Sequence, residues 1–306
     1  MASARRLYRL TLGLGVLAGL TLVAALATVS LAVDPASPSM AELAAACGQY
    51  VLAFSAPGLL ISAVGSLGLA SVLCGMRSAT MQLRCQRRLR SRLEIVEHRT
   101  ACDANVAVVS DPRPQAFCAG VLRARIYVST GAIAALDARE LHAVLAHEAH
   151  HAARRDPLRV FVAHVLRDSL FFLPIMRHAA ERYCALAEMA ADDAAVHRLG
   201  GHGPLASAML TFEGRAPAGA VGIAPERVDH LLGEPMRWQL SASLLLAGAA
   251  TLSGIAVLGA AAASAAPAGG LSMAVLVMQL CALAMAVLPF VAGVALVLTV
   301  KRALAS

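Results

Sequence analysis

Charged residues are scarce in this sequence, and their scarcity excludes an ordinary soluble domain. Only 15% of the 306 residues are charged, whereas 58% are hydrophobic. Soluble domains carry about 25% charged residues. The hydrophobic residues also cluster, because four uncharged runs reach the length of about 20 residues that a membrane-spanning helix needs. These runs are residues 10–33, 51–75, 240–266 and 271–300.

Basic residues are missing from both short segments between the paired runs. All 26 lysines and arginines lie at residues 5–9, 77–237 and 301–302, and none lies at 34–50 or 267–270. Because basic residues stay on the cytoplasmic side, we expect both termini and the central region in the cytoplasm. This topology accounts for the net charge of +7. The sequence has no basic stripe with interleaved aromatic residues, so we expect no nucleic-acid partner.

Paired cysteine motifs are absent as well. The seven cysteines form no C-x-x-C pair, which argues against a structural disulfide and favours a reducing compartment. The first apolar run follows Arg5, Arg6 and Arg9, so it is open to interpretation as a signal peptide. The apolar core of a cleaved signal has about 7–15 residues, and the greater length here favours a retained anchor.

One helix-like stretch, residues 140–151, carries a metal-binding pattern. His147, Glu148 and His151 form H-E-x-x-H. Residues four apart share a helix face, so both histidines can bind one metal ion, and Glu148 can take a proton from a metal-bound water. The pattern predicts a zinc hydrolase with one Zn²⁺ per chain. The alternative is a surface helix that happens to be rich in histidine.

The start of this helix is marked by Asp137, a predicted N-cap, with Glu140 three residues later as in a capping box. A third ligand must come from elsewhere, since a catalytic zinc has three protein ligands. We expect Glu188, on a helix at residues 179–199, with Asp192 on the same face to orient the site. Glu181 on that helix is the competitor.

Two further polar residues lie close to the pattern in sequence. Asp156 is five residues after His151 and is expected to accept the free N–H of a ligand histidine. The alternative is an ordinary aspartate that ends a helix before Pro157. We expect His150 to support the ligands from outside or to be solvated.

Short strands are predicted at residues 105–110, 116–120 and 125–129. If one of them forms a sheet edge, Ala116, Phe117 and Cys118 can hydrogen-bond an extended substrate. The basic stretch 77–93 predicts a helix along the inner membrane surface, either attracted to anionic lipid or merely solvated. The apolar residues 158–176 include charged side chains, so we expect a cytoplasmic helix there, buried in the domain or lying in the membrane interface.

Taken in order, these residues resemble the membrane zinc peptidases of the BlaR/MecR type. The resemblance covers residues from about 100 to 232 and rests on Pro114, Ala116, Phe117, Gly120, Ile126, Ser129, Glu140, Leu141, His147, Glu148, His151, Arg154, Arg155, Asp156, Glu188 and Asp192.

The resemblance implies a gluzincin-like domain in the cytoplasm. It also implies that His147, His151 and Glu188 are the ligands, with Glu148 as general base, and that proteolysis inactivates a transcriptional repressor. Sensors of this type carry an extracellular penicillin-binding domain after the last span. The present sequence ends at Ser306, so we expect that domain to be lacking.

We therefore expect a mainly α membrane protein with four transmembrane helices and a cytoplasmic α+β zincin-like domain between spans 2 and 3. The expected parts are an N-terminal hairpin at 1–76, the metallopeptidase domain at 77–239 and a C-terminal hairpin at 240–306.

Three functions compete at this stage. The first is a regulatory zinc endopeptidase in the cell membrane that cuts a winged-helix repressor or its own chain. The second is a housekeeping peptidase of the heat-shock or CAAX type, which shares the residues of the site. The third is a signalling scaffold that retains a zinc site without catalysis.

We predict that reporter fusions at Pro38 and Pro267 will give an external signal, because neither segment carries a basic residue. Alkaline phosphatase and green fluorescent protein fused at each position make the measurement. A cytoplasmic signal at either position would overturn the four-span topology.

Overall fold

The computed structural model describes residues 2–31, 33–34, 39–41, 56–102, 104–213, 227, 230, 241–265, 271–274 and 277. The chain divides into two compact units. One comprises residues 1–16 and 71–248, and the other comprises residues 17–70 and 249–306. The first unit contains a four-stranded sheet and every predicted site residue.

Three described helices are long and apolar enough to cross a membrane: α1 (Ala2–Leu31), α3 (Ala56–Arg92) and α10 (Ala242–Ser264). They fall on the first three apolar runs. Residues 271 and 272, where the fourth run begins, form strand β6 (Leu271–Ser272) instead of helix, paired in parallel with β1 (Val33–Asp34). Most of the fourth run lies outside the described residues, so the count of four spans stays a prediction.

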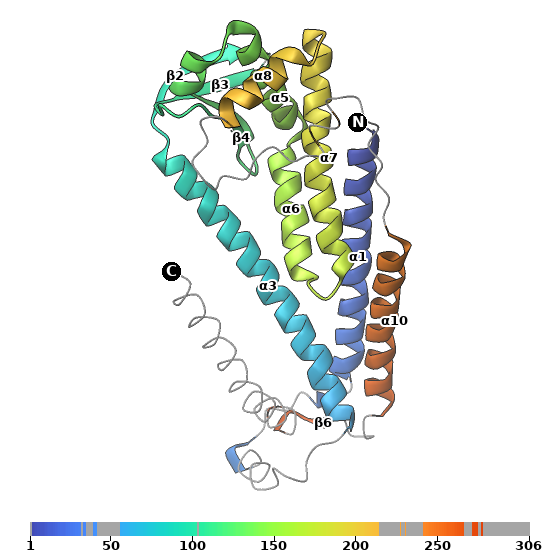
Figure 1. Ribbon diagram of the computed structural model, residues 1–306. Coiled ribbons are helices and arrows are strands. Elements are labelled where there is room, and N and C mark those ends of the chain that lie inside the picture. Colours follow the sequence, from blue (N-terminus) through green and yellow to red (C-terminus); the bar gives the residue numbers. More distant parts are fainter. Residues whose placement is uncertain are drawn as a thin grey trace, which may run out of the picture. The chain divides into compact units, whose positions relative to one another are not determined.

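The helix predicted for the basic stretch is present as a continuation of α3. Its apolar part is followed without a break by arginine-rich turns that end at Arg92. One long helix therefore runs from the apolar residues to the start of the sheet-bearing region (Figure 1).

A four-stranded sheet follows α3. Its strands are β2 (Ile95–Ala101), β3 (Ala104–Val109), β4 (Ala116–Ala119) and β5 (Arg125–Ser129), in the order β2-β3-β5-β4. β3 and β5 are parallel, and the other two pairs are antiparallel. Sequence reasoning missed β2, because this strand is almost wholly exposed and Glu97, His98 and Arg99 remove any apolar alternation.

The sheet and α5 (Ala138–Arg154) share one hydrophobic core. Alternate residues of β3 and β5 point to the same face, as the period of two in a strand requires. They pack against the apolar side of α5 in a cluster that includes Val106, Val108, Ile126, Val128, Val144 and Leu145. This packing fixes the helix that carries H-E-x-x-H against the sheet.

Four more helices are described in this unit: α4 (Thr130–Ala135), α6 (Asp156–Ser169), α7 (Pro174–Leu199) and α8 (Gly203–Glu213). The predicted capping box at the start of α5 is present. The Asp137 carboxylate accepts from the backbone N–H groups of Arg139 and Glu140, and Glu140 accepts from the N–H of Asp137. Both α7 and α8 pack against α5 (Figure 1).

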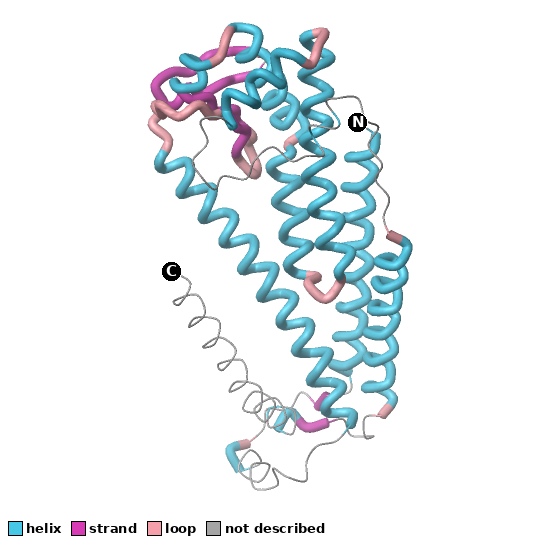
Figure 2. Tube along the Cα trace, in the orientation of Figure 1, coloured by secondary structure: helices cyan, strands magenta, loops and turns pink. Residues whose placement is uncertain are grey.

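The expectation of one helix at residues 158–176 is wrong. α6 ends at Ser169, a turn follows, and Pro174 begins α7. Proline has no N–H and fits the first turn of a helix, where that N–H would be unpaired. The two helices therefore form a hairpin, drawn as two helices joined by a loop in Figure 2.

Candidate metal site

His147 and His151 lie one turn apart on α5, and both side chains are buried. Their Nε2 atoms are 3.2 Å apart, and the two rings are inclined at 77°. The helical spacing that made the motif recognisable therefore brings two imidazole nitrogens to one point.

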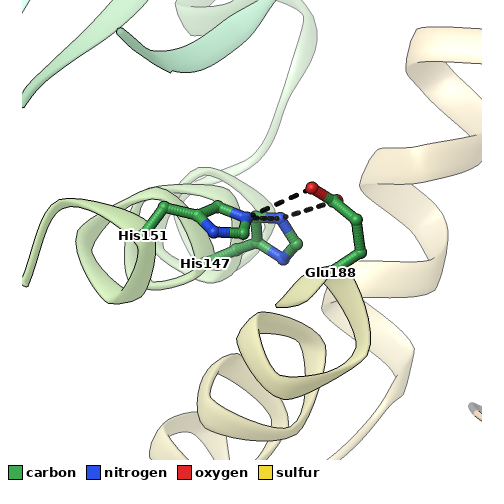
Figure 3. Close-up of side chains that lie close together, drawn as sticks. All are labelled: His147, His151 and Glu188. Atoms are coloured by element: carbon green, nitrogen blue, oxygen red, sulfur yellow. Dashed lines mark hydrogen bonds and ion pairs between the residues drawn. The ribbon is translucent and has the colours of Figure 1, made fainter. Parts of the chain in front are cut away.

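Glu188 of α7 reaches the same point from the neighbouring helix. Its Oε2 lies 3.5 Å from Nε2 of His147, and its Oε1 lies 3.5 Å from Nε2 of His151. Figure 3 shows the carboxylate facing both rings. One ligand atom from each of the three residues lies within 4.8 Å of the others, and the set is two nitrogens and a carboxylate oxygen.

The other nitrogen of each ring faces an aspartate. Nδ1 of His147 lies 2.8 Å from Asp192 Oδ1, and Nδ1 of His151 lies 2.9 Å from Asp156 Oδ2. The His151 contact has hydrogen-bond geometry, whereas the His147 contact is within ion-pair distance only. A carboxylate beside Nδ1 favours the ring proton at that nitrogen. Each Nε2 is then left with a lone pair directed at its neighbour and at Glu188.

The residues present fit a divalent metal ion. When both histidines are neutral, two imidazole lone pairs and one carboxylate converge at one point, which is unfavourable unless a cation lies between them. Two histidines and a glutamate are also the protein ligands of a known class of catalytic zinc site. The donor set is thus complete for a zinc ion that keeps one position open.

The electrostatics of the site agree with this arrangement. Burial alone lowers the pKa of His147, but the carboxylates of Asp192 and Glu188 outweigh it and raise the pKa to about 9. Burial raises the pKa of Glu188 and of Asp192, yet His147 and Arg227 beside both carboxylates, with His151 beside Glu188, bring the two pKa values below the ordinary range. The cluster therefore attracts positive charge.

Glu148 follows His147 on α5 and is buried. It lines a cavity of about 360 Å³ together with His147, His151, Glu188, Phe117 and Cys118. Burial raises the pKa of its carboxyl, opposed by His147 and His151, and the backbone of Cys118 hydrogen-bonds it. This acid is placed to exchange a proton with a molecule held in the cavity.

The three strand residues suggested for substrate lie on β4, at one end of the sheet order. β4 pairs with β5 along one side, and no other described strand pairs with it. Phe117 and Cys118 line the cavity beside Glu148. Burial, with the charge of Glu148, raises the pKa of the Cys118 thiol to about 12, so this thiol is protonated at neutral pH.

The structure does not bring Glu181 or His150 into the cluster. The side chain of Glu181 is 56% exposed and pairs with Arg177 at 3.0 Å. His150 is half-buried, and burial together with the charge of Arg154 lowers its pKa to about 4. Its ring centre lies 6.4 Å from that of His151, so it is a neighbour of the site.

Two contributors were missed by sequence reasoning. The hydroxyl of Tyr183 donates to Asp156 Oδ1 at 3.1 Å. Arg227 donates from Nε and Nη2 to the two oxygens of Asp192 at 2.9 and 2.7 Å, and its Nη1 lies 3.1 Å from Glu188 Oε2. Arg227 and His230 are the residues that the structure describes between 214 and 240, and both are helical.

No local pattern could have identified these residues. Arg227 follows Asp192 by 35 positions, and Tyr183 follows Asp156 by 27. Helix periodicity relates positions within a few turns only. Even if an arginine is expected beside the two acidic residues, the sequence offers many arginines and the fold is needed to choose among them.

Residues 28–219 match the sequence family described as BlaR1 peptidase M56. A comparison with curated proteins gives no match.

We predict that Glu188→Ala will bind zinc much more weakly than the unchanged protein, because only two protein ligands remain. Asp192→Ala should lower the affinity for zinc about 10–100-fold, which is the usual effect of removing a group that orients a metal ligand. Glu181→Ala is the matched control on the same helix and should bind normally. Zinc titration of the purified proteins decides, and the assignment fails if Glu181→Ala loses zinc while Glu188→Ala keeps it.

Proposed function

The chain belongs to the BlaR1 peptidase M56 family, and on this basis we propose that it is a zinc endopeptidase of the cell membrane with its active site on the cytoplasmic side. Family membership makes it a membrane-associated metallopeptidase that acts on protein. The observation that carries the proposal is the convergence of His147, His151 and Glu188 beside the buried acid Glu148.

In this proposal His147 and His151 hold the metal through Nε2, and Glu188 holds it through a carboxylate oxygen. Zinc bound there would polarise a peptide carbonyl and make water more acidic. Asp192 and Asp156 keep the protons on the Nδ1 atoms, so each Nε2 lone pair stays available. Arg227 holds Asp192 in place and limits the repulsion between Asp192 and Glu188.

Glu148 is the proposed general base. Its pKa is raised by burial, which makes the carboxylate a better proton acceptor than an exposed glutamate. It takes a proton from the attacking water and passes it to the leaving amine of the peptide bond.

We propose that β4 binds the substrate as an added strand through Ala116, Phe117 and Cys118. The support is its position at the end of the sheet and the contribution of Phe117 and Cys118 to the cavity. Backbone hydrogen bonds along an edge strand give affinity with little dependence on side chains. Such binding would present an extended peptide next to Glu148.

The proposed biological role is regulatory proteolysis of a winged-helix repressor or of the chain itself, and it rests on the family match. Proteomics of newly formed N-termini, comparing unchanged cells with a Glu148→Gln strain, tests it. Cleavage confined to a repressor or to this chain supports the role. Cleavage of many unrelated membrane proteins would favour the housekeeping alternative.

We predict that Glu148→Gln will retain stoichiometric zinc and lose about 10²–10⁴-fold in peptidase rate, the usual contribution of a general base. The change removes the proton acceptor and leaves the three ligand atoms untouched. Metal analysis and cleavage of a fluorogenic peptide in detergent measure the two effects, with Glu181→Gln as control. Unchanged activity of the Glu148 variant would exclude this mechanism, and zinc binding without activity in the unchanged protein would favour a scaffold.

A further inference from the structure

A second cavity lies away from the metal site, between α3 and the α6–α7 hairpin. Its volume is about 600 Å³. The polar lining is dominated by arginine, with an aromatic side chain beside it. The lining residues that matter here are Arg77, Arg167, Arg177, Asp168, Glu181 and Phe171.

The neighbouring carboxylates do not occupy all the hydrogen-bond donors of the three arginines. Nε of Arg167 donates to Asp168 at 2.8 Å, and Nε of Arg177 donates to Glu181 at 3.0 Å. Arg77 has no ion-pair partner among the described residues. Three guanidinium groups and two carboxylates leave one net positive charge. The terminal amino groups of the arginines, which make no bond with another described side chain, can take an anion.

The α6–α7 turn lies at the level of the apolar part of α3. The Ser71 hydroxyl donates to the backbone oxygen of Ser169 at 2.7 Å, and a side chain at Gly75 would collide with Ser169. Ser71 precedes Arg77 by six residues, which is about 9 Å along a helix. Because Arg77 is the first basic residue after the apolar run, the turn reaches past the polar boundary.

The turn itself is apolar. Residues 170–173 are Leu-Phe-Phe-Leu. Leu170 and Leu173 are buried, whereas Phe171 is 52% exposed. An exposed phenylalanine at the end of a hairpin is unfavourable in water and favourable at the edge of a bilayer. The cavity therefore opens where lipid headgroups meet acyl chains.

We propose that this cavity binds the phosphate of an anionic phospholipid from the adjacent leaflet. Arginine guanidinium groups pair with phosphate oxygens through two parallel hydrogen bonds. Basic pockets at this depth in membrane proteins hold anionic headgroups. The acyl chains would lie along Phe171 and the apolar part of α3. The inference concerns a site that the peptidase mechanism does not use, and it stands or falls separately from that mechanism.

Native mass spectrometry of the delipidated protein tests the site directly. The probes are dioleoylphosphatidylglycerol, dioleoylphosphatidylcholine and inorganic phosphate. The triple variant Arg77→Gln, Arg167→Gln, Arg177→Gln should lose about tenfold or more in affinity for phosphatidylglycerol. The control triple Arg84→Gln, Arg87→Gln, Arg88→Gln removes the same charge from exposed positions further along α3 and should bind normally.

Arg77→Gln alone keeps both ion pairs and guards against misfolding of the triple variant. This single change should weaken the binding of phosphatidylglycerol about fivefold. Three outcomes would overturn the proposal: equal losses in both triple variants, equal binding of the two lipids, or full displacement of phosphatidylglycerol by millimolar inorganic phosphate. The last of these would assign the cavity to a soluble anion.

A separate experiment measures how deep the α6–α7 turn lies in the bilayer. In a Trp238→Phe background, which removes the only native tryptophan, Phe171→Trp should be quenched by brominated phosphatidylcholine in vesicles. Leu122→Trp, at a position that is 82% exposed in the sheet-bearing region, is the control and should be quenched by aqueous acrylamide instead. Quenching of Phe171→Trp by acrylamide alone would place the turn in water and refute the site.

Discussion

The metal site depends on two contacts between a carboxylate and an imidazole. Asp192 faces Nδ1 of His147, and Asp156 faces Nδ1 of His151, at 2.8 and 2.9 Å. These contacts decide which ring nitrogen carries the proton and therefore where both lone pairs point. Without them the histidines would still be neighbours on α5, but their Nε2 atoms would not be fixed as acceptors beside Glu188.

Each contact has a local origin in the chain. Arg155 adopts a left-handed conformation with φ of 54°, ends α5 and lets α6 begin at once, so Asp156 turns back toward the preceding helix. Asp192 lies one turn after Glu188 on α7, so the helix that supplies the third converging group also supplies the support for His147. Packing of α7 against α5 then places the carboxylates of Glu188 and Asp192 beside the histidines of α5.

Sequence reasoning reached what helix periodicity encodes and little beyond it. His147, Glu148 and His151 follow from spacing alone, and the capping box of α5 follows from Asp137 and Glu140. The placement of Glu188 needed an assumption about which helix packs on α5, and its role as a ligand still awaits the zinc titration. Arg227 and Tyr183 act over long sequence separations, while β2 lacks apolar alternation. The break at 170–173 was hidden because the turn is as apolar as the helices around it.

Charge balance explains why so many acids can be buried together. Asp192 is paired with Arg227, and Asp156 lies 3.8 and 3.7 Å from Arg154 and Arg159. Arg227 is shared with Glu188 at 3.1 Å. With neutral histidines, the carboxylates of Asp156, Asp192, Glu148 and Glu188 and the three arginines leave one negative charge. A buried charge is costly unless it is compensated. A cation at the convergence of His147, His151 and Glu188 would compensate this charge, so the arrangement of acids favours a metal ion there.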